Sequence, residues 1–154
     1  MSDQDLLQLY STRILALASS IPRLGHLANH DGTAKKRAPL CGSTVSVELV
    51  IEDGRIASFA QEVRACALGQ AAASVVGGSV VGLTPEEVRA GRNALWRMLR
   101  EGGEAPAPPF QDLAVLIPAR DHANRHGSIM LAFEATLDAI EQAEAGPKKA
   151  AGSP

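Results

Sequence analysis

The sequence predicts an α+β fold in which helices pack on one face of a small antiparallel β-sheet. Residues 44–51 alternate apolar and polar side chains with period two, as a half-buried strand does. Asp53-Gly54 follows, a pair that favours a two-residue hairpin turn because both central residues of that turn have positive φ. Residues 55–63 then return as a second strand, and helical periodicity flanks this hairpin on both sides.

The segment before the hairpin is expected to hold one helix and one short strand. Apolar residues at helical spacing predict a helix from about Asp3 to Ser19, with Ser2 and Asp5 as a capping box. Pro22 follows the end of that helix. Residues 33–37 are predicted as an edge strand beside the hairpin.

The segment after the hairpin is expected to be helical, with one irregular loop. Small residues predict a helix over 66–76, which Gly77-Gly78 would end. Thr84-Pro85-Glu86-Glu87 is typical of a helix start, with Thr as N-cap, Pro at the first helical position and Glu three residues after the cap. The remaining predicted elements, in order, are a proline-rich loop over 102–109, a short helix over 110–117 and a last helix from about Asn124 to Ala143.

Composition and charge restrict the class of protein. The 154 residues are 45% hydrophobic and 21% charged, which predicts one globular domain over 1–145. Residues 146–154 are small and polar, so a disordered tail is expected there. The net charge of −2 and the absence of a basic block argue against nucleic acid, and no apolar run reaches the ~20 residues of a membrane span. The N-terminus lacks a signal-peptide pattern, which favours the cytoplasm.

The chain contains two cysteines, one on each side of the hairpin. Cys41 precedes the outgoing strand and Cys66 follows the returning one, so antiparallel pairing is expected to bring the two thiols together. The helix expected to begin at Cys66 would favour its thiolate through unpaired backbone N–H groups. Two thiolates supply half of a tetrahedral zinc site or half of an iron–sulfur cradle. The alternative is that each cysteine is buried as a small apolar side chain.

A histidine near the start of the last predicted helix is a candidate third ligand. Imidazole nitrogen suits zinc and iron, so His126 together with Cys41 and Cys66 would form a chemically reasonable metal site. His122 lies at i, i+4 spacing from His126, a pattern that is weak by itself.

The cysteine motifs resemble those of the NifU/IscU/SufU family of iron–sulfur cluster assembly scaffolds. The resemblance is carried by Pro39-Leu40-Cys41-Gly42, by the hairpin, and by Cys66 before a helix of small residues. It covers roughly residues 6–140, and the long segment 84–118 is similar to the SufU branch. It implies a SufE/NifU-like α+β fold.

Two family positions are occupied here by other residues. The family pattern has Asp two residues after the first cysteine, where this chain has Ser43. The family has a third cysteine at the start of the last helix, and the matching position here is Ser128, or Gly127 if the alignment slips by one residue.

The resemblance implies a scaffold-like protein that binds iron, zinc or a nascent cluster and passes it to acceptor proteins, rather than an enzyme. It implies a cysteine desulfurase as partner and a monomer or weak dimer. The cofactor would be a transient iron–sulfur cluster or zinc, or none. Two alternatives stay open: a sulfur (persulfide) acceptor working with a cysteine desulfurase, and a degenerate metal-free member that acts only as a binding partner.

Overall fold

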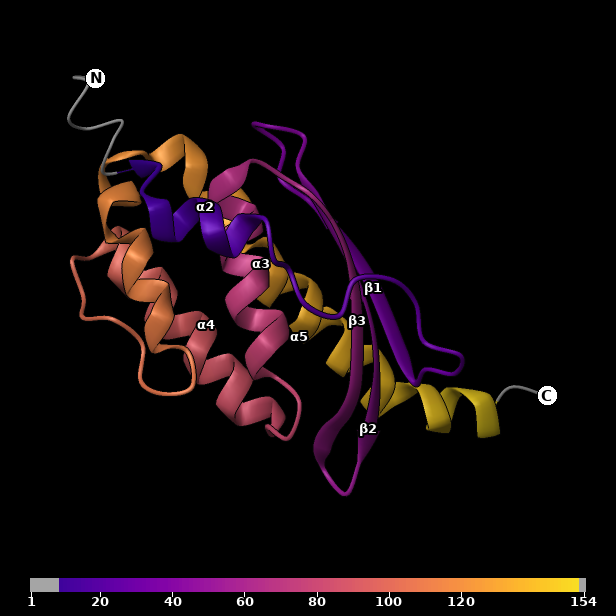
Figure 1. Cartoon of the computed structure of the whole chain (residues 1–154). Coiled ribbons are helices and arrows are strands. Elements are labelled where there is room, and N and C mark those ends of the chain that lie inside the picture. The colour runs from indigo at the N-terminus through magenta and orange to yellow at the C-terminus, as the bar shows by residue number, and fades with distance from the viewer. Residues whose placement is uncertain (1–8, 153–154) are drawn as a thin grey trace.

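The fold is built on a three-stranded antiparallel sheet with strand order β1-β2-β3. The computed structural model describes the backbone of residues 9–152 and the side chains of residues 9–145. The strands are β1 (Gly32–Arg37), β2 (Thr44–Glu52) and β3 (Arg55–Arg64). Helices cover one face of this sheet (Figure 1), which confirms the predicted α+β class.

The hairpin of β2 and β3 forms as its turn residues predict. Asp53 and Gly54 have φ of 53° and 76°, the left-handed values that this turn requires. Val45, Val47 and Leu49 are fully buried on the face toward the helices. The apolar alternation therefore sets which face of the hairpin is covered.

Two layers of helix lie on the buried face of the sheet (Figure 1). In the first, α5 (Ala123–Gly152) crosses β1 and β2, and α3 (Ala67–Ser79) packs beside it. In the second, α2 (Thr12–Ala18) packs on α3, and α4 (Pro85–Arg100) packs on α5 and on the 3-10 helix η1 (Gln111–Asp121). Within the described residues, none of these helices is both long enough and apolar enough to cross a membrane.

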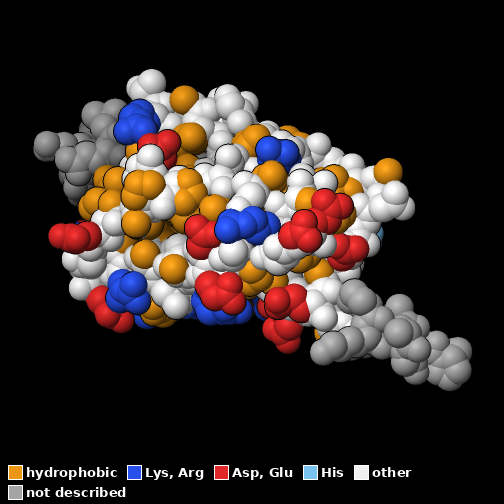
Figure 2. All heavy atoms as spheres, turned by 90° about the horizontal axis from the view of Figure 1, so that it is seen from below, with side chains coloured by type: hydrophobic (Ala, Val, Ile, Leu, Met, Phe, Trp, Pro, Cys, Tyr) orange, Lys and Arg blue, Asp and Glu red, His pale blue; other side chains and the backbone are white. Residues whose placement is uncertain are grey.

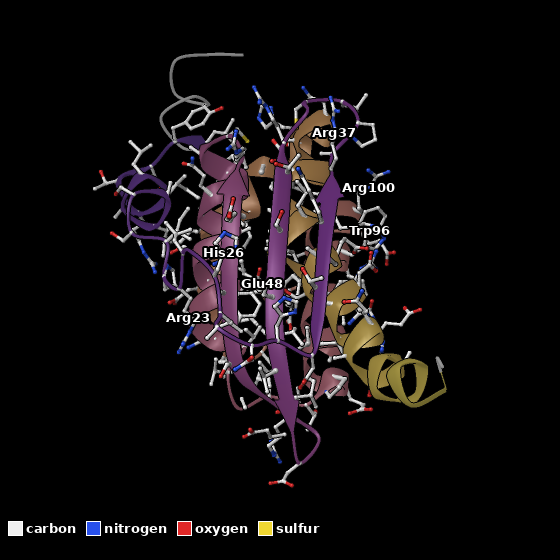
Figure 3. The ribbon with its side chains drawn as sticks, turned by 90° about the vertical axis from the view of Figure 1, so that its right-hand side faces the viewer. Arg23, His26, Arg37, Glu48, Trp96 and Arg100 are labelled. Carbon is white, nitrogen blue, oxygen red and sulfur yellow. The ribbon has the colours of Figure 1, made fainter. Side chains whose placement is uncertain are left out.

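The opposite face of the sheet is crossed by the segment that follows α2. His26 Nδ1 lies 3.0 Å from Glu48 Oε2, and its Nε2 contacts Glu62. The backbone N–H of Leu27 donates to Glu48 Oε1 at 2.8 Å. Figure 3 shows His26 and Glu48 over the middle of the sheet. We call His26, Glu48 and Glu62 the histidine clamp, and nothing in the sequence pattern of this polar loop predicted it.

The first predicted helix is interrupted. Ser11 is the N-cap of α2, and its hydroxyl accepts the backbone N–H of Ile14 at 3.2 Å, so a new helix begins at Thr12. The prediction of one helix from Asp3 to Ser19 was wrong at this point, because a serine hydroxyl competes with the backbone for that N–H. The predicted capping box of Ser2 and Asp5 lies outside the described residues.

The glycine pair predicted to end the next helix lies inside it. The α3 helix continues to Ser79, and a Cβ on Gly77 would collide with the side-chain amide of Gln61. Gly77 therefore permits close packing and does not stop the helix. The capping box predicted at Thr84 is present, with its hydroxyl accepting the N–H of Glu87 at 3.2 Å.

The last two elements run further than expected. The 3-10 helix continues through Pro118 to Asp121, and the backbone of α5 is helical to Gly152. Side chains beyond Ala145 are outside the description. The disorder expected for residues 146–154 and the domain boundary near 145 stay predictions.

Candidate functional site

The two cysteines lie at the open end of the hairpin. Thr44, the first residue of β2, pairs with Arg64, the last residue of β3. Cys41 lies shortly before this pair and Cys66 shortly after it, as the N-cap of α3. The hairpin therefore brings the cysteines to one end of the sheet, as its turn predicted.

Two serine side chains connect the cysteines. Cys41 Sγ is 3.1 Å from Ser43 Oγ, and the Ser128 hydroxyl donates to Ser43 Oγ at 3.1 Å. Ser128 Oγ is in turn 3.6 Å from Cys66 Sγ. We call these four residues the cysteine–serine site. Its two serines are Ser43 and Ser128, the residues that the resemblance to the scaffold family matches to an Asp and a third Cys.

Burial differs sharply within the cysteine–serine site. Ser43 and Ser128 are only 6% and 1% exposed, whereas Cys41 is exposed and Cys66 is half-buried. The thiol of Cys41 is therefore the part of the site that a partner reaches first.

A tight turn holds Cys41 outward. The N–H of Gly42 donates to the Ala38 carbonyl at 2.9 Å, and the N–H of Ala38 donates to the Ser43 carbonyl at 2.8 Å. Gly42 has a φ of 72°, which glycine adopts without the steric cost that a Cβ brings. The same turn that exposes Cys41 buries Ser43 beneath it.

Close packing of two helices brings Ser128 to Cys66. A Cβ on Gly69 of α3 would collide with the hydroxyl oxygen of Ser128 on α5. Glycine at 69 thus lets the two helices approach until Ser128 reaches the site.

Hydrogen bonds from neighbouring groups lower the pKa of the Cys41 thiol. The Ser43 hydroxyl lowers the pKa of Cys41, more than partial desolvation raises it. The backbone of Ser43, the Ser128 hydroxyl and the charge of Arg125 lower that pKa further. A larger thiolate fraction at an exposed position is what a nucleophilic or metal-binding cysteine requires.

The group that lowers the pKa of Cys41 most is close to it in the sequence. The start of a helix at Cys66 predicts a stabilised thiolate at that residue. The Cys66 side chain makes no capping hydrogen bond to α3. The signal in the sequence for the lowered pKa of Cys41 is the hydroxyl of Ser43, two residues further on.

His126 is not assembled with the cysteines. Its ring is 3% exposed, and its Nε2 lies 2.9 Å from the Ala119 carbonyl. Over the residues whose side chains are described, 9–145, no three His, Cys, Asp or Glu side chains gather as a metal site. The set Cys41, Cys66 and His126 is therefore not brought together, because His126 precedes Ser128 by two positions, roughly 200° around a helix.

The structure also distinguishes the two alignments of the last helix. Gly127 is exposed, and a Cβ there would point toward Ala38 at 3.7 Å. Ser128 is the residue whose side chain lies in the cysteine–serine site.

The donor set determines which metal species fits. Closed zinc sites take four Cys, His or carboxylate ligands, and two cysteines with two serine hydroxyls do not supply them. The site therefore does not fit a resident zinc ion. Two thiolates can still hold iron or a cluster as cargo through half of the usual cysteine ligands.

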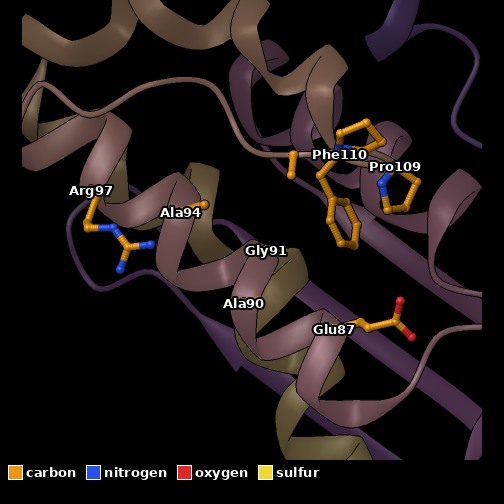
Figure 4. A pocket seen from close by; sticks show the side chains of 9 residues that line it. Glu87, Ala90, Gly91, Ala94, Arg97, Pro109 and Phe110 are labelled. Carbon is orange, nitrogen blue, oxygen red and sulfur yellow. The ribbon is translucent and has the colours of Figure 1, made fainter.

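A surface pocket of about 320 Å³ between α4 and residues 107–110 contains no residue of the cysteine–serine site (Figure 4). Its one carboxylate, Glu87, is already used, because it accepts the N–H of Thr84 at 3.0 Å and pairs with Arg55 at 3.6 Å. A Cβ on Gly91 in its floor would collide with the Phe110 ring. This pocket has no free acid or nucleophile.

Comparison with known proteins assigns the family. No protein-family model and no curated protein matches the chain. Among solved structures, the N-terminal part of a nitrogen-fixing NifU-like protein from Brucella abortus is 46% identical with a TM-score of 0.88, over 91% of this chain and 97% of that one. The chain belongs to the NifU-like family, as its cysteine motifs indicated.

Two more distant structures share the fold. One is a proposed iron–sulfur cluster assembly scaffold protein for the SUF system from thermophilic Fervidobacterium islandicum AW-1, with 18% identity, a TM-score of 0.78, and coverage of 87% of this chain and 98% of that one. The other is a hypothetical protein with 22% identity, a TM-score of 0.71, and coverage of 88% and 98%.

Proposed function

We propose that this protein acts as an iron–sulfur cluster assembly scaffold that holds iron or a nascent cluster as cargo at Cys41 and Cys66 and passes it to acceptor proteins. The observation that carries the proposal is the cysteine–serine site, where two serine hydroxyls connect Cys41 to Cys66. Both cysteines stand in motifs that resemble those of the family. Membership of the NifU-like family supports it. A cysteine desulfurase would supply the sulfur, in the cytoplasm.

The chemistry of the donors suits temporary binding. Thiolate sulfur is a soft ligand for iron, whereas a neutral serine hydroxyl is a weak one. Cargo held by two thiolates keeps open coordination positions, at which the thiolates of an acceptor protein can replace those of Cys41 and Cys66.

A persulfide acceptor is the second candidate, and the exposed Cys41 with its lowered pKa favours it. The Cys41 thiolate would attack the outer sulfur of a persulfide on the desulfurase. The sulfur–sulfur bond of the donor breaks, a new one forms at Cys41, and the donor cysteine leaves as a thiolate. The Ser43 hydroxyl would donate a hydrogen bond to the Cys41 thiolate before the attack.

One experiment separates these candidates. The purified protein is incubated without oxygen with ferrous iron, cysteine and a cysteine desulfurase, and then analysed for iron, sulfide and mass. A scaffold gains iron and sulfide with visible absorption, and Cys41→Ser and Cys66→Ser each abolish it. An acceptor gains sulfur on Cys41 without iron. If neither appears, the protein is a metal-free binding partner and both proposals are wrong.

The role of Ser43 in the thiol chemistry has its own test. In a Cys66→Ser background, Ser43→Ala is expected to slow alkylation of Cys41 by iodoacetamide at pH 7, because losing the hydroxyl raises the pKa of Cys41. Ser46→Ala, on the neighbouring outward position of β2, is the matched control and leaves the rate unchanged. Equal rates in the Ser43 variant and its parent would contradict the assignment.

A further inference from the structure

The outer flank of α4 carries an aromatic ring between two guanidinium groups. The Cζ atoms of Arg92 and Arg100 lie 5.4 and 4.9 Å from the centroid of the Trp96 ring. Figure 3 shows Trp96 beside Arg100 at one edge of the molecule. Arg89 shares this flank, because residues three, four and seven positions apart lie on one side of a helix. We call Arg89, Arg92, Trp96 and Arg100 the arginine–tryptophan stripe.

The charges of this stripe are only partly neutralised. Arg92 donates from Nε to Glu134 of α5 at 2.6 Å and from a terminal nitrogen to Asn93 at 3.3 Å, which fixes its guanidinium. Arg89 and Arg100 are exposed, and neither forms an ion pair within the part of the chain whose side chains are described. The stripe is thus a local cationic feature on a protein whose net charge is −2.

Helix stability alone does not account for the stripe. A basic residue in the last turn interacts favourably with the helix dipole, and this explains Arg100. It does not explain Arg89 near the beginning of α4, nor the placement of the only tryptophan of the chain at a half-buried surface position. Tryptophan and arginine are the residues most enriched where protein interfaces gain their binding energy.

We propose that the arginine–tryptophan stripe is a docking surface for an acidic helix of a partner protein. From Arg89 to Arg100 the stripe runs roughly 16 Å along α4, which matches about three turns of a partner helix. Carboxylates at i, i+4 spacing on such a helix face the exposed guanidiniums. Stacking on Trp96 holds the guanidiniums of Arg92 and Arg100 in place, so these two side chains lose less entropy on binding.

Two other anionic partners fit the stripe less well. Insertion into a lipid surface needs protruding apolar side chains, and the exposed large ones among the described residues are Leu15, Leu24 and Leu40, none of them on α4. A nucleic acid needs a broad basic field. The face shown in Figure 2 instead carries acidic and basic side chains side by side, and Glu134 lies directly against the stripe.

The single tryptophan provides a direct readout. The full-length protein is titrated with a synthetic helical peptide of about fifteen residues, four turns, with Glu at i, i+4 positions, leucine between them, and neither Trp nor Tyr. Saturable change in Trp96 emission is expected, and binding weakens as salt is added. Arg89→Gln together with Arg100→Gln should weaken it at least about fivefold, since each removes a guanidinium that faces a carboxylate.

The controls make the outcome decisive. Arg97→Gln removes an arginine that lines the pocket of Figure 4 and does not stack on Trp96, and it is expected to leave peptide affinity unchanged. A peptide with Gln in place of Glu fails to bind. The proposal is overturned if the emission does not saturate, or if Arg97→Gln weakens binding as much as the double variant. It is equally overturned if only phosphatidylserine vesicles or a single-stranded oligonucleotide change the emission.

Discussion

Ser128 shows how one side chain determines what the cysteine–serine site can hold. Its hydroxyl lies 3.6 Å from Cys66 Sγ and 3.1 Å from Ser43 Oγ, so a sulfur atom at this position would complete a set of three thiolates. Ser128→Cys is therefore expected to tighten binding of zinc or an iron–sulfur cluster by at least about tenfold, because each added ligand in a preformed site increases affinity. Competition against a coloured chelator measures the change.

The neighbouring position supplies the control for this substitution. Gly127→Cys would place its side chain toward Ala38, so it is expected to gain much less affinity. Equal affinity of Ser128→Cys and the natural protein would mean that α5 does not present residue 128 to the cysteines as described.

At this scale the sequence could predict the cysteine pair but not the face of α5. The Asp53-Gly54 turn fixes the hairpin, and the hairpin brings Cys41 and Cys66 to one end. A shift of one residue in a helix turns the side chain by about 100°, and periodicity does not resolve such a shift. Only the packing against α3 distinguishes Ser128 from Gly127.

At the scale of elements, the close approach of α3 and α5 is the feature that the site depends on. Gly69→Ala would force its Cβ against Ser128, so a loss of about 1–3 kcal/mol in the free energy of unfolding is expected, as for other overpacked cores. Urea unfolding followed by circular dichroism measures this loss, and cluster or iron binding should weaken with it because Ser128 is displaced.

A second glycine of the same helix is the matched control. A Cβ on Gly78 would meet Pro22 at 3.6 Å, an ordinary contact. Gly78→Ala is therefore expected to keep or raise stability, since alanine is favoured over glycine in a helix by roughly 0.5–1 kcal/mol. A loss at Gly78 as large as that at Gly69 would show that helix α3 is intolerant in general.

At the scale of the whole molecule, the histidine clamp joins the segment after α2 to the outer face of the sheet, and it makes stability depend on pH. Glu48 raises the pKa of His26 above 6.5, with Glu62 adding to it. A raised folded-state pKa gives stabilisation that is complete below the unfolded value and is lost as pH rises through the folded one. The Leu27 N–H and His26 lower the pKa of Glu48 below 4.5, so its contribution is present above that pH and is lost in acid.

The clamp is therefore expected to be strongest between about pH 4.5 and 6.5, the unfolded values of the two groups. His26→Gln should destabilise the protein more at pH 5.5 than at pH 8.5 in urea unfolding. The comparison is repeated in a Glu48→Gln background, where the dependence on pH should shrink. A His26→Gln effect that is equal at both pH values would contradict the clamp.

The contacts of the histidine clamp could not be predicted from the sequence, because they join residues that lie far apart in the chain. His26 and Glu62 are brought together by the β2–β3 hairpin and by the path of a loop, and neither residue stands in a pattern that predicts the other. The α+β class was predictable because each local pattern indicates the element that forms there. The alternation of apolar residues indicates β2, Asp53-Gly54 indicates the hairpin turn, and the capping box at Thr84 indicates the start of α4. The break at Ser11 was not predictable, because apolar residues continue at helical spacing across it and that spacing does not show that the Ser11 hydroxyl caps a new helix.

The residues of the cysteine–serine site are synthesised at different times, because Ser128 lies far behind the two cysteines in the chain. Cys41 and Cys66 leave the ribosome long before Ser128, and α5 also supplies the cover for β1 and β2. A nascent chain that stops short of α5 has both thiols but neither the buried hydroxyl between them nor the helix that shields the sheet. The packed site, in which a buried hydroxyl lies between the two thiols, therefore forms only after α5 has been made.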